Sequence, residues 1–165
     1  MLSEKRKKEL LFPHEEVRKF QEDLILDIDQ TIKNKNKLIV SAPTGLGKTV
    51  SALAPALNQS LKENLVIWFL TNRHTQHKLA VDTLKLIQDQ FNLKFNCVDL
   101  LGKRWMCGQA VKELFSQEFN EFCKTLTEKN ECEFLNRVKA KNKLTVEAQG
   151  FLERLSQKGV LHNEE

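Results

Sequence analysis

The sequence has no hydrophobic run that approaches the length of a membrane span, which excludes a transmembrane helix of ordinary length. Its first eight residues are mostly charged and lack the apolar core of a signal peptide. We therefore expect an intracellular protein, cytoplasmic and nucleoid-associated in a prokaryote or nuclear in a eukaryote. No internal repeat or low-complexity tract interrupts the 165 residues, and a net charge of +4 permits nucleic-acid binding without requiring it.

Cysteine is scarce, with four residues in the chain. In a reducing compartment so few thiols favour a metal or redox site, or simple core packing, over a disulfide framework. Cys97 lies in an apolar segment, where core packing is its expected role. Cys107, Cys123 and Cys132 lie in polar, helix-forming sequence, and their gaps match no compact zinc motif. Sequence alone leaves packing and metal coordination open for these three.

One glycine-containing stretch predicts a phosphate-binding loop. It follows the apolar residues 38–40 and precedes a helix-forming segment, the strand–loop–helix context that a P-loop requires. Its glycines let backbone N–H groups converge on an anion, and the helix N-terminus adds a partial positive charge. The predicted loop and nucleotide contacts are Ala42, Pro43, Thr44, Gly45, Leu46, Gly47, Lys48 and Thr49. Lys48 supplies charge for the β- and γ-phosphates, and Thr49 supplies a hydroxyl for Mg²⁺.

Hydrophobic periodicity predicts an α/β domain followed by a helical insertion. After a charged and frayed start, the expected order is helix 13–33, strand 38–42, helix 49–61, strand 65–70, helix 75–90 and strand 93–101. This alternation indicates a P-loop parallel sheet with helices on both faces. The composition changes near Lys103, so we assign residues 1–102 to the ATP-binding domain and residues 103–165 to a helical, cysteine-bearing insertion.

Three further groups of residues are candidates for binding. Thr71, Arg73, His74 and Gln76 follow strand 65–70, at the edge where open α/β sheets bind ligands, although an ordinary polar loop with Thr71 or Thr75 as N-cap fits equally well. The donor–acceptor pair of Gln21, beside Arg18, suits an adenine edge, although a solvated helix face is the simpler interpretation. Lys103 and Arg104 flank Trp105, which either stacks on a base or packs against the sheet.

Taken in order, these stretches resemble the start of superfamily 2 helicases of the xeroderma pigmentosum group D type. Residues 12–21 resemble the family's nucleotide-edge motif, residues 42–49 its motif I, and residues 70–76 its motif Ia. Residues 101–107, 121–124 and 131–134 resemble the cysteine motifs of its iron–sulfur domain. The resemblance implies a RecA-like fold, ATP with Mg²⁺, and a [4Fe–4S] cluster on Cys107, Cys123 and Cys132. It also implies that Arg18 and Gln21 contact adenine, and that Thr71, Arg73, His74, Gln76, Lys103 and Arg104 contact single-stranded DNA or duplex junctions.

The resemblance implies a monomeric, ATP-dependent DNA helicase moving 5′ to 3′ in DNA repair or related DNA metabolism. The sequence departs from the family in lacking a fourth cluster cysteine after Cys132 and a Walker B box of adjacent acids. We therefore expect an N-terminal portion of a longer protein, inactive alone because the acids that activate water are absent. The alternative is a stand-alone nucleotide-binding module with a zinc site or structural cysteines. A signalling or transport ATPase is disfavoured by the 71–76 loop and the cysteines.

Overall fold

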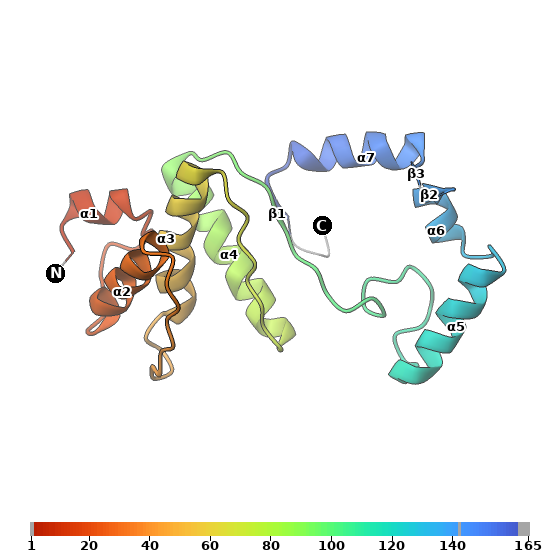
Figure 1. Cartoon of the computed structure of the whole chain (residues 1–165), viewed down its shortest axis with the longest axis horizontal. Helices are drawn as coiled ribbons and strands as arrows, with labels where there is room; N and C mark the ends of the chain where they lie inside the picture. Colours follow the sequence, from red (N-terminus) through yellow and green to blue (C-terminus); the bar gives the residue numbers. More distant parts are fainter. Residues whose placement is uncertain (1, 142, 162–165) are drawn as a thin grey trace. The chain divides into compact units, whose positions relative to one another are not determined.

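The computed structural model describes residues 2–141 and 143–161 and is mainly helical (Figure 1). Its helices are α1 (Glu4–Glu9), α2 (Gln21–Lys33), α3 (Lys48–Glu63), α4 (His74–Phe91), α5 (Ser116–Glu128), α6 (Glu133–Val138) and α7 (Val146–Ser156). The strands are β1 (Cys97–Val98), β2 (Lys139–Ala140), β3 (Lys143–Leu144) and β4 (Val160–Leu161). The chain divides into two compact units, residues 1–95 and residues 96–165, which we describe separately.

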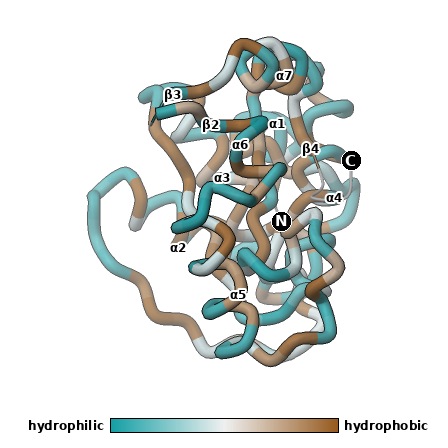
Figure 2. The backbone as a smooth tube through the Cα atoms, turned by 90° about the vertical axis from the view of Figure 1, so that its right-hand side faces the viewer, coloured by the Kyte–Doolittle hydropathy of each residue, from teal (hydrophilic) through white to brown (hydrophobic). Residues whose placement is uncertain are grey.

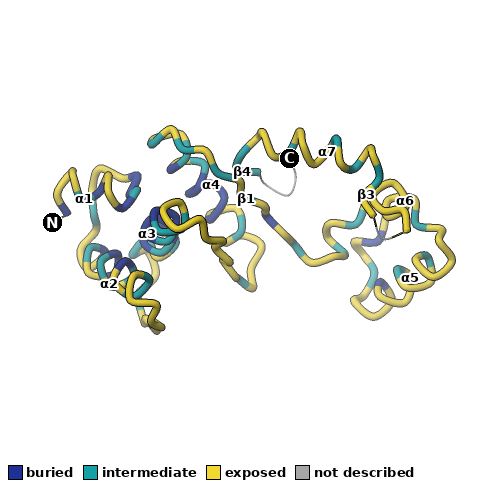
Figure 3. Tube along the Cα trace, turned by 45° about the horizontal axis from the view of Figure 1, so that its top comes forward, coloured by how far each residue is buried: buried dark blue, intermediate teal, exposed yellow. Residues whose placement is uncertain are grey.

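The core of the first unit lies between three helices. Helix α3 packs against both α2 and α4, and Figure 3 shows the buried residues gathered on these helices. Ile25, Leu53 and Ile87, one from each helix, are at most 2% exposed. Burial of each such side chain stabilises the fold by about 1.5–3 kcal/mol. The predicted helices 49–61 and 75–90 are confirmed as α3 and α4.

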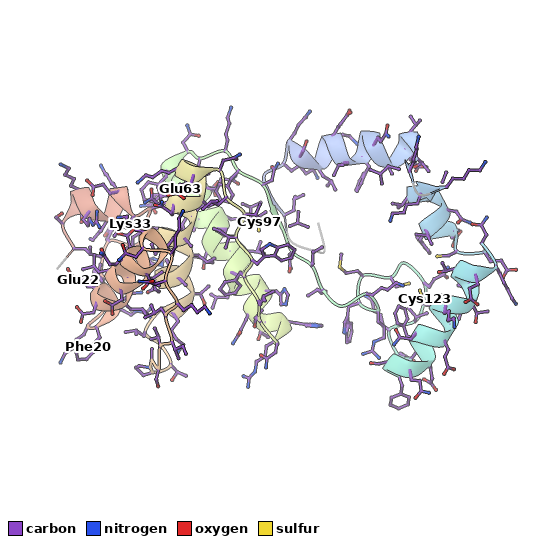
Figure 4. The ribbon with its side chains drawn as sticks, viewed as in Figure 1. Phe20, Glu22, Lys33, Glu63, Cys97 and Cys123 are labelled. Atoms are coloured by element: carbon purple, nitrogen blue, oxygen red, sulfur yellow. The ribbon has the colours of Figure 1, made fainter. Side chains whose placement is uncertain are left out.

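The N-terminal region differs from the sequence prediction. Residues expected to fray form α1, because the Ser3 hydroxyl accepts a hydrogen bond from the backbone N–H of Arg6 and caps the helix. The predicted helix 13–33 begins only at Gln21. Phe20 adopts a left-handed conformation (φ 65°), which interrupts a helix at that position, and its ring is exposed (Figure 4).

The predicted strands 38–42 and 65–70 were wrong for this structure. Both segments lack strand hydrogen bonding, since nothing in the described part of the chain pairs with them. Their apolar side chains are correspondingly exposed, with Ile39 at 99%, Val66 at 80% and Leu70 at 84%. Figure 2 shows how hydrophobic stretches alternate with hydrophilic ones along the backbone. The predicted parallel sheet with helices on both faces is therefore not assembled among the described residues.

Among its described residues, the second unit combines three helices with two very small sheets. β1 and β4 pair in parallel, so the predicted strand 93–101 is reduced to Cys97–Val98. β2 and β3 form an antiparallel hairpin between α6 and α7. Helix α5 begins where the Glu118 carboxylate accepts a hydrogen bond from the Phe115 N–H at 2.8 Å. None of the helices in the described ranges is long and apolar enough to cross a bilayer.

Candidate nucleotide-binding site

The predicted phosphate loop connects the extended segment 38–41 to the first turn of α3. Gly45 (φ 82°) and Gly47 (φ 86°) both adopt left-handed conformations, which glycine reaches without steric cost. Lys48 and Thr49 open the helix, so their backbone N–H groups have no acceptor within it. The loop therefore presents helix-terminal donors of the kind that bind phosphate.

Lys48 folds back over this loop. Its Nζ donates hydrogen bonds to the carbonyl oxygen of Pro43 at 2.8 Å and to that of Ala42 at 3.0 Å. The ammonium group thus lies at the loop itself, where a bound anion would compete with the two carbonyls for its protons. A phosphate carries full negative charge, so exchange of neutral acceptors for charged ones is favourable for Lys48.

Arg18, in the segment before α2, and Gln21, the first residue of α2, both contact the loop. The Arg18 guanidinium donates to the carbonyl oxygen of Gly45, and the Gln21 amide Nε2 donates to that of Gly47 at 3.5 Å. The Gln21 Oε1 in turn accepts from the Arg18 backbone N–H at 3.0 Å. The structure therefore brings together residues that are far apart in the sequence, and buries Gln21 almost completely.

Ser51 also contributes to the loop, and the sequence analysis missed it. Its hydroxyl donates to the Gly47 carbonyl oxygen at 2.9 Å, and its backbone N–H donates to the same atom at 3.0 Å. A serine one turn into a predicted helix is a common site for such a bond to the preceding turn, which is the signal that was available.

The 71–76 loop leads into α4, as expected. Arg73 is the N-cap residue and makes no side-chain cap, so neither Thr71 nor Thr75, the caps of the alternative interpretation, occupies the N-cap position. The Thr71 hydroxyl instead donates to the Gln76 side-chain oxygen and accepts from the Arg73 N–H at 3.4 Å. His74 contacts His77 edge-on, with ring centroids 6.1 Å apart. The four candidate residues therefore lie together at the start of one helix.

In the second unit, Lys103 and Arg104 make local contacts. The Arg104 guanidinium donates to the Leu114 carbonyl oxygen and lies 5.1 Å from the Trp105 ring centroid. A hydrogen bond to Cys123, on α5 (Figure 4), and further interactions with Cys107 and Cys132 raise the pKa of Lys103. Cys123 therefore has the largest effect on Lys103.

The thiols do not form a metal site in this arrangement. All four cysteines are reduced and half-buried, and in residues 2–141 and 143–161 no three His, Cys, Asp or Glu side chains converge to hold a metal ion. Burial, with a smaller effect of Asp99, raises the pKa of the Cys97 thiol, consistent with its predicted packing role.

Comparison with known proteins places the chain in a family. The family described as type III restriction enzyme, res subunit, matches residues 14–157. The chain belongs to this family. The match contains the phosphate loop, the Arg18–Gln21 segment and the 71–76 loop, and membership implies a RecA-like nucleotide-binding fold.

A probable ATP-dependent helicase of Methanocaldococcus jannaschii is 37% identical to this family member over 116 residues. The matched region covers 68% of this chain and 17% of that protein, so the chain spans only a small part of the relative's length. No solved structure matches the chain.

Proposed function

We propose that this chain is the ATP-binding, N-terminal portion of an ATP-dependent DNA helicase. The observation that carries the proposal is the convergence of Lys48, Arg18 and Gln21 on one glycine-containing loop at a helix N-terminus. Family membership and the similarity to a probable ATP-dependent helicase support it. The boundary at residue 102, with a separate helical insertion after it, is part of the same proposal.

The residues present fit a nucleoside triphosphate with Mg²⁺. The backbone donors of Lys48 and Thr49 and the Lys48 ammonium bind the phosphates, and the Thr49 hydroxyl is the metal ligand of this chain. Bound Mg²⁺ supplies charge neutralisation at the transferring phosphoryl group. Arg18 and Gln21 hold the loop. Selection of adenine by the donor and acceptor of the Gln21 amide requires that nucleotide binding release its hydrogen bonds to Gly47 and Arg18.

Single-stranded DNA is the proposed polymer substrate. Thr71, Arg73, His74 and Gln76 offer hydroxyl, guanidinium, imidazole and amide groups at the start of α4, a composition suited to phosphate oxygens. Lys103 and Arg104 add positive charge in the second unit. Movement from 5′ to 3′, a monomeric motor and a role in DNA repair belong to this proposal through the resemblance to the xeroderma pigmentosum group D type.

The most detailed element of the proposal is a [4Fe–4S] cluster on Cys107, Cys123 and Cys132. Its support comes from the sequence motifs. The thiols as arranged do not fit a cluster, so no step of the mechanism is assigned to it. Iron and sulfide analysis of an anaerobic preparation, with its visible absorption, tests the cluster. Zinc without iron would favour the stand-alone module instead.

The decisive experiment measures ATP binding by the full chain and by Lys48→Ala. We expect the variant to lose at least about tenfold in affinity, because a charge-assisted phosphate contact is removed. Lys62→Ala, which removes an exposed lysine from the other end of α3, is the matched control. Equal affinity of Lys48→Ala and the unchanged chain would refute the proposal. Negligible turnover by the 165-residue chain, against robust turnover by a longer protein, would support the assignment of an incomplete motor.

A further inference from the structure

The hairpin β2–β3 is the most concentrated positive feature of the second unit. Arg137, Lys139, Lys141 and Lys143 fall within residues 137–143, and no acid interrupts them. All four side chains are exposed. Arg137 is paired with Glu147 of α7 at 2.6 Å, whereas within the described part of the chain Lys139 and Lys143 have no carboxylate partner. Most of the charge on this hairpin is therefore available to a ligand.

An apolar groove of about 570 Å³ lies beside the hairpin, between α6 and α7. Its apolar wall includes Val138, Leu144, Phe151 and Leu155. Lys139 and Leu144 are cross-strand partners, so their side chains project from the same face of the hairpin. The lysine therefore lies at the rim of the groove that the leucine lines.

Phe151 is the more exposed of the two phenylalanines that line the groove. Its ring is 54% exposed, and the Arg154 guanidinium lies 5.7 Å from its centroid. The other aromatic residue of the groove, Phe134, is less exposed, at 39%, and its ring lies against Gly108, where a Cβ would overlap it. An exposed phenylalanine beside an arginine is the surface on which bases stack in single-stranded nucleic-acid sites.

We propose that this groove and hairpin bind single-stranded nucleic acid, with a base stacked on Phe151 and the adjacent phosphates held by Lys139 and Arg154. The positive charge of the hairpin distinguishes between the possible ligands of the groove. An apolar ligand would leave the hairpin cations without a partner, whereas a polyanion carrying aromatic bases satisfies both the groove and its rim. The inference deepens the proposed function by adding a second polymer contact beyond the 71–76 loop.

The test measures binding of a fluorescein-labelled oligothymidylate to the full chain, without nucleotide, over a series of salt concentrations. Lys139→Gln should weaken binding and reduce the slope of log affinity against log salt by about 0.7, the value for one phosphate contact on a single strand. Lys129→Gln removes an exposed lysine from the end of α5 and should leave the slope unchanged. Because Lys139 is exposed, its replacement does not endanger folding.

Phe151→Leu tests the stacking contact. It should weaken binding by at least about fivefold with the salt slope unchanged, since stacking involves no counterion release. Phe115→Leu replaces another exposed phenylalanine and is the control. Equal behaviour of each variant and its control would overturn the inference, as would the absence of any oligothymidylate binding by the unchanged chain. Neither result depends on ATP affinity, so failure here is distinct from failure of Lys48→Ala.

Discussion

The side-chain amide of Gln21 lies directly against Gly47, with its Nε2 3.5 Å from the glycine carbonyl oxygen. A Cβ at Gly47 would overlap that nitrogen. The absence of a side chain at position 47 therefore does two things: it permits the left-handed backbone and makes room for the buried glutamine. The predicted phosphate loop and the first residue of α2 therefore fit closely together.

Replacement of the two loop glycines by alanine should separate these effects. Gly45→Ala introduces only the cost of a left-handed alanine, about 1–2 kcal/mol, because nothing lies within 4 Å of its Cβ. Gly47→Ala adds overlap with Gln21 and should lower the free energy of unfolding further. Urea denaturation of both variants measures the difference. Adding Gln21→Ala should recover part of the loss at Gly47 and none at Gly45; equal costs at the two glycines would contradict the contact.

A buried carboxylate joins α1 to α2. Asp29 is 3% exposed, and its Oδ2 accepts from Arg6 at 2.9 Å and from Lys33 at 2.7 Å. Asp29→Ala should lower the free energy of unfolding by about 1–3 kcal/mol, because it removes charge-assisted hydrogen bonds in a dry environment. Asp27→Ala, at an exposed position of the same helix, should cost far less in thermal denaturation. A similar loss at both positions would mean that helix propensity, not the ion pairs, determines the effect.

Local signals in the sequence were sufficient to predict α3, α4 and the glycine-containing loop before Lys48. The apolar spacing of α3 and α4, and the glycines before Lys48, specify those features within a few residues. The start of α2 was missed because the left-handed Phe20 has no propensity signal, and α1 because its cap is a single serine. The prediction of the parallel sheet was wrong for another reason. Apolar runs predict strands, but a strand exists only where a neighbouring segment pairs with it through hydrogen bonds.

In the candidate site, too, some features could be predicted from the local sequence and others depend on tertiary packing. Residues 42–49 were predicted to be a phosphate loop from spacing alone, whereas the contacts of Arg18 and Gln21 with Gly45 and Gly47 depend on packing between α2 and α3 that no local pattern encodes. The cysteine motifs resembled a cluster site, yet among the described residues the thiols do not converge to form one. The groove beside Phe151 required the tertiary arrangement of α6, the hairpin and α7.

Cys97 should be the least reactive thiol of the chain. Burial raises its pKa, so a smaller fraction is thiolate at about pH 8 than for an ordinary cysteine. In a variant with Cys107, Cys123 and Cys132 replaced by serine, iodoacetamide should modify Cys97 slowly when native and quickly in urea. Equal rates in the two states would contradict its burial.

The same shift predicts the sign of a pH effect on stability. Because the pKa of Cys97 is higher in the folded than in the unfolded state, its contribution is fully present below the unfolded value, about 8.5, and is lost as the pH rises through the folded value. The unfolding free energy of the native chain should therefore fall more between about pH 8 and 10 than that of Cys97→Ser, measured by urea titration. If the unfolding free energies of the two proteins fell in parallel with pH, ionisation of Cys97 would not be the cause of the loss.

Tryptophan fluorescence can test whether the 65–70 segment is exposed in solution. Trp68 is 77% exposed, whereas Trp105, the second tryptophan, is 42% exposed and contacts Arg104. In Trp105→Phe the remaining emission should resemble that of tryptophan in water and be strongly quenched by iodide. In Trp68→Phe the quenching should be weaker, because the indole of Trp105 is shielded on one face. Blue-shifted, poorly quenched emission from Trp68 would mean that the 65–70 segment is paired and covered in solution, as a central strand of a parallel sheet would be.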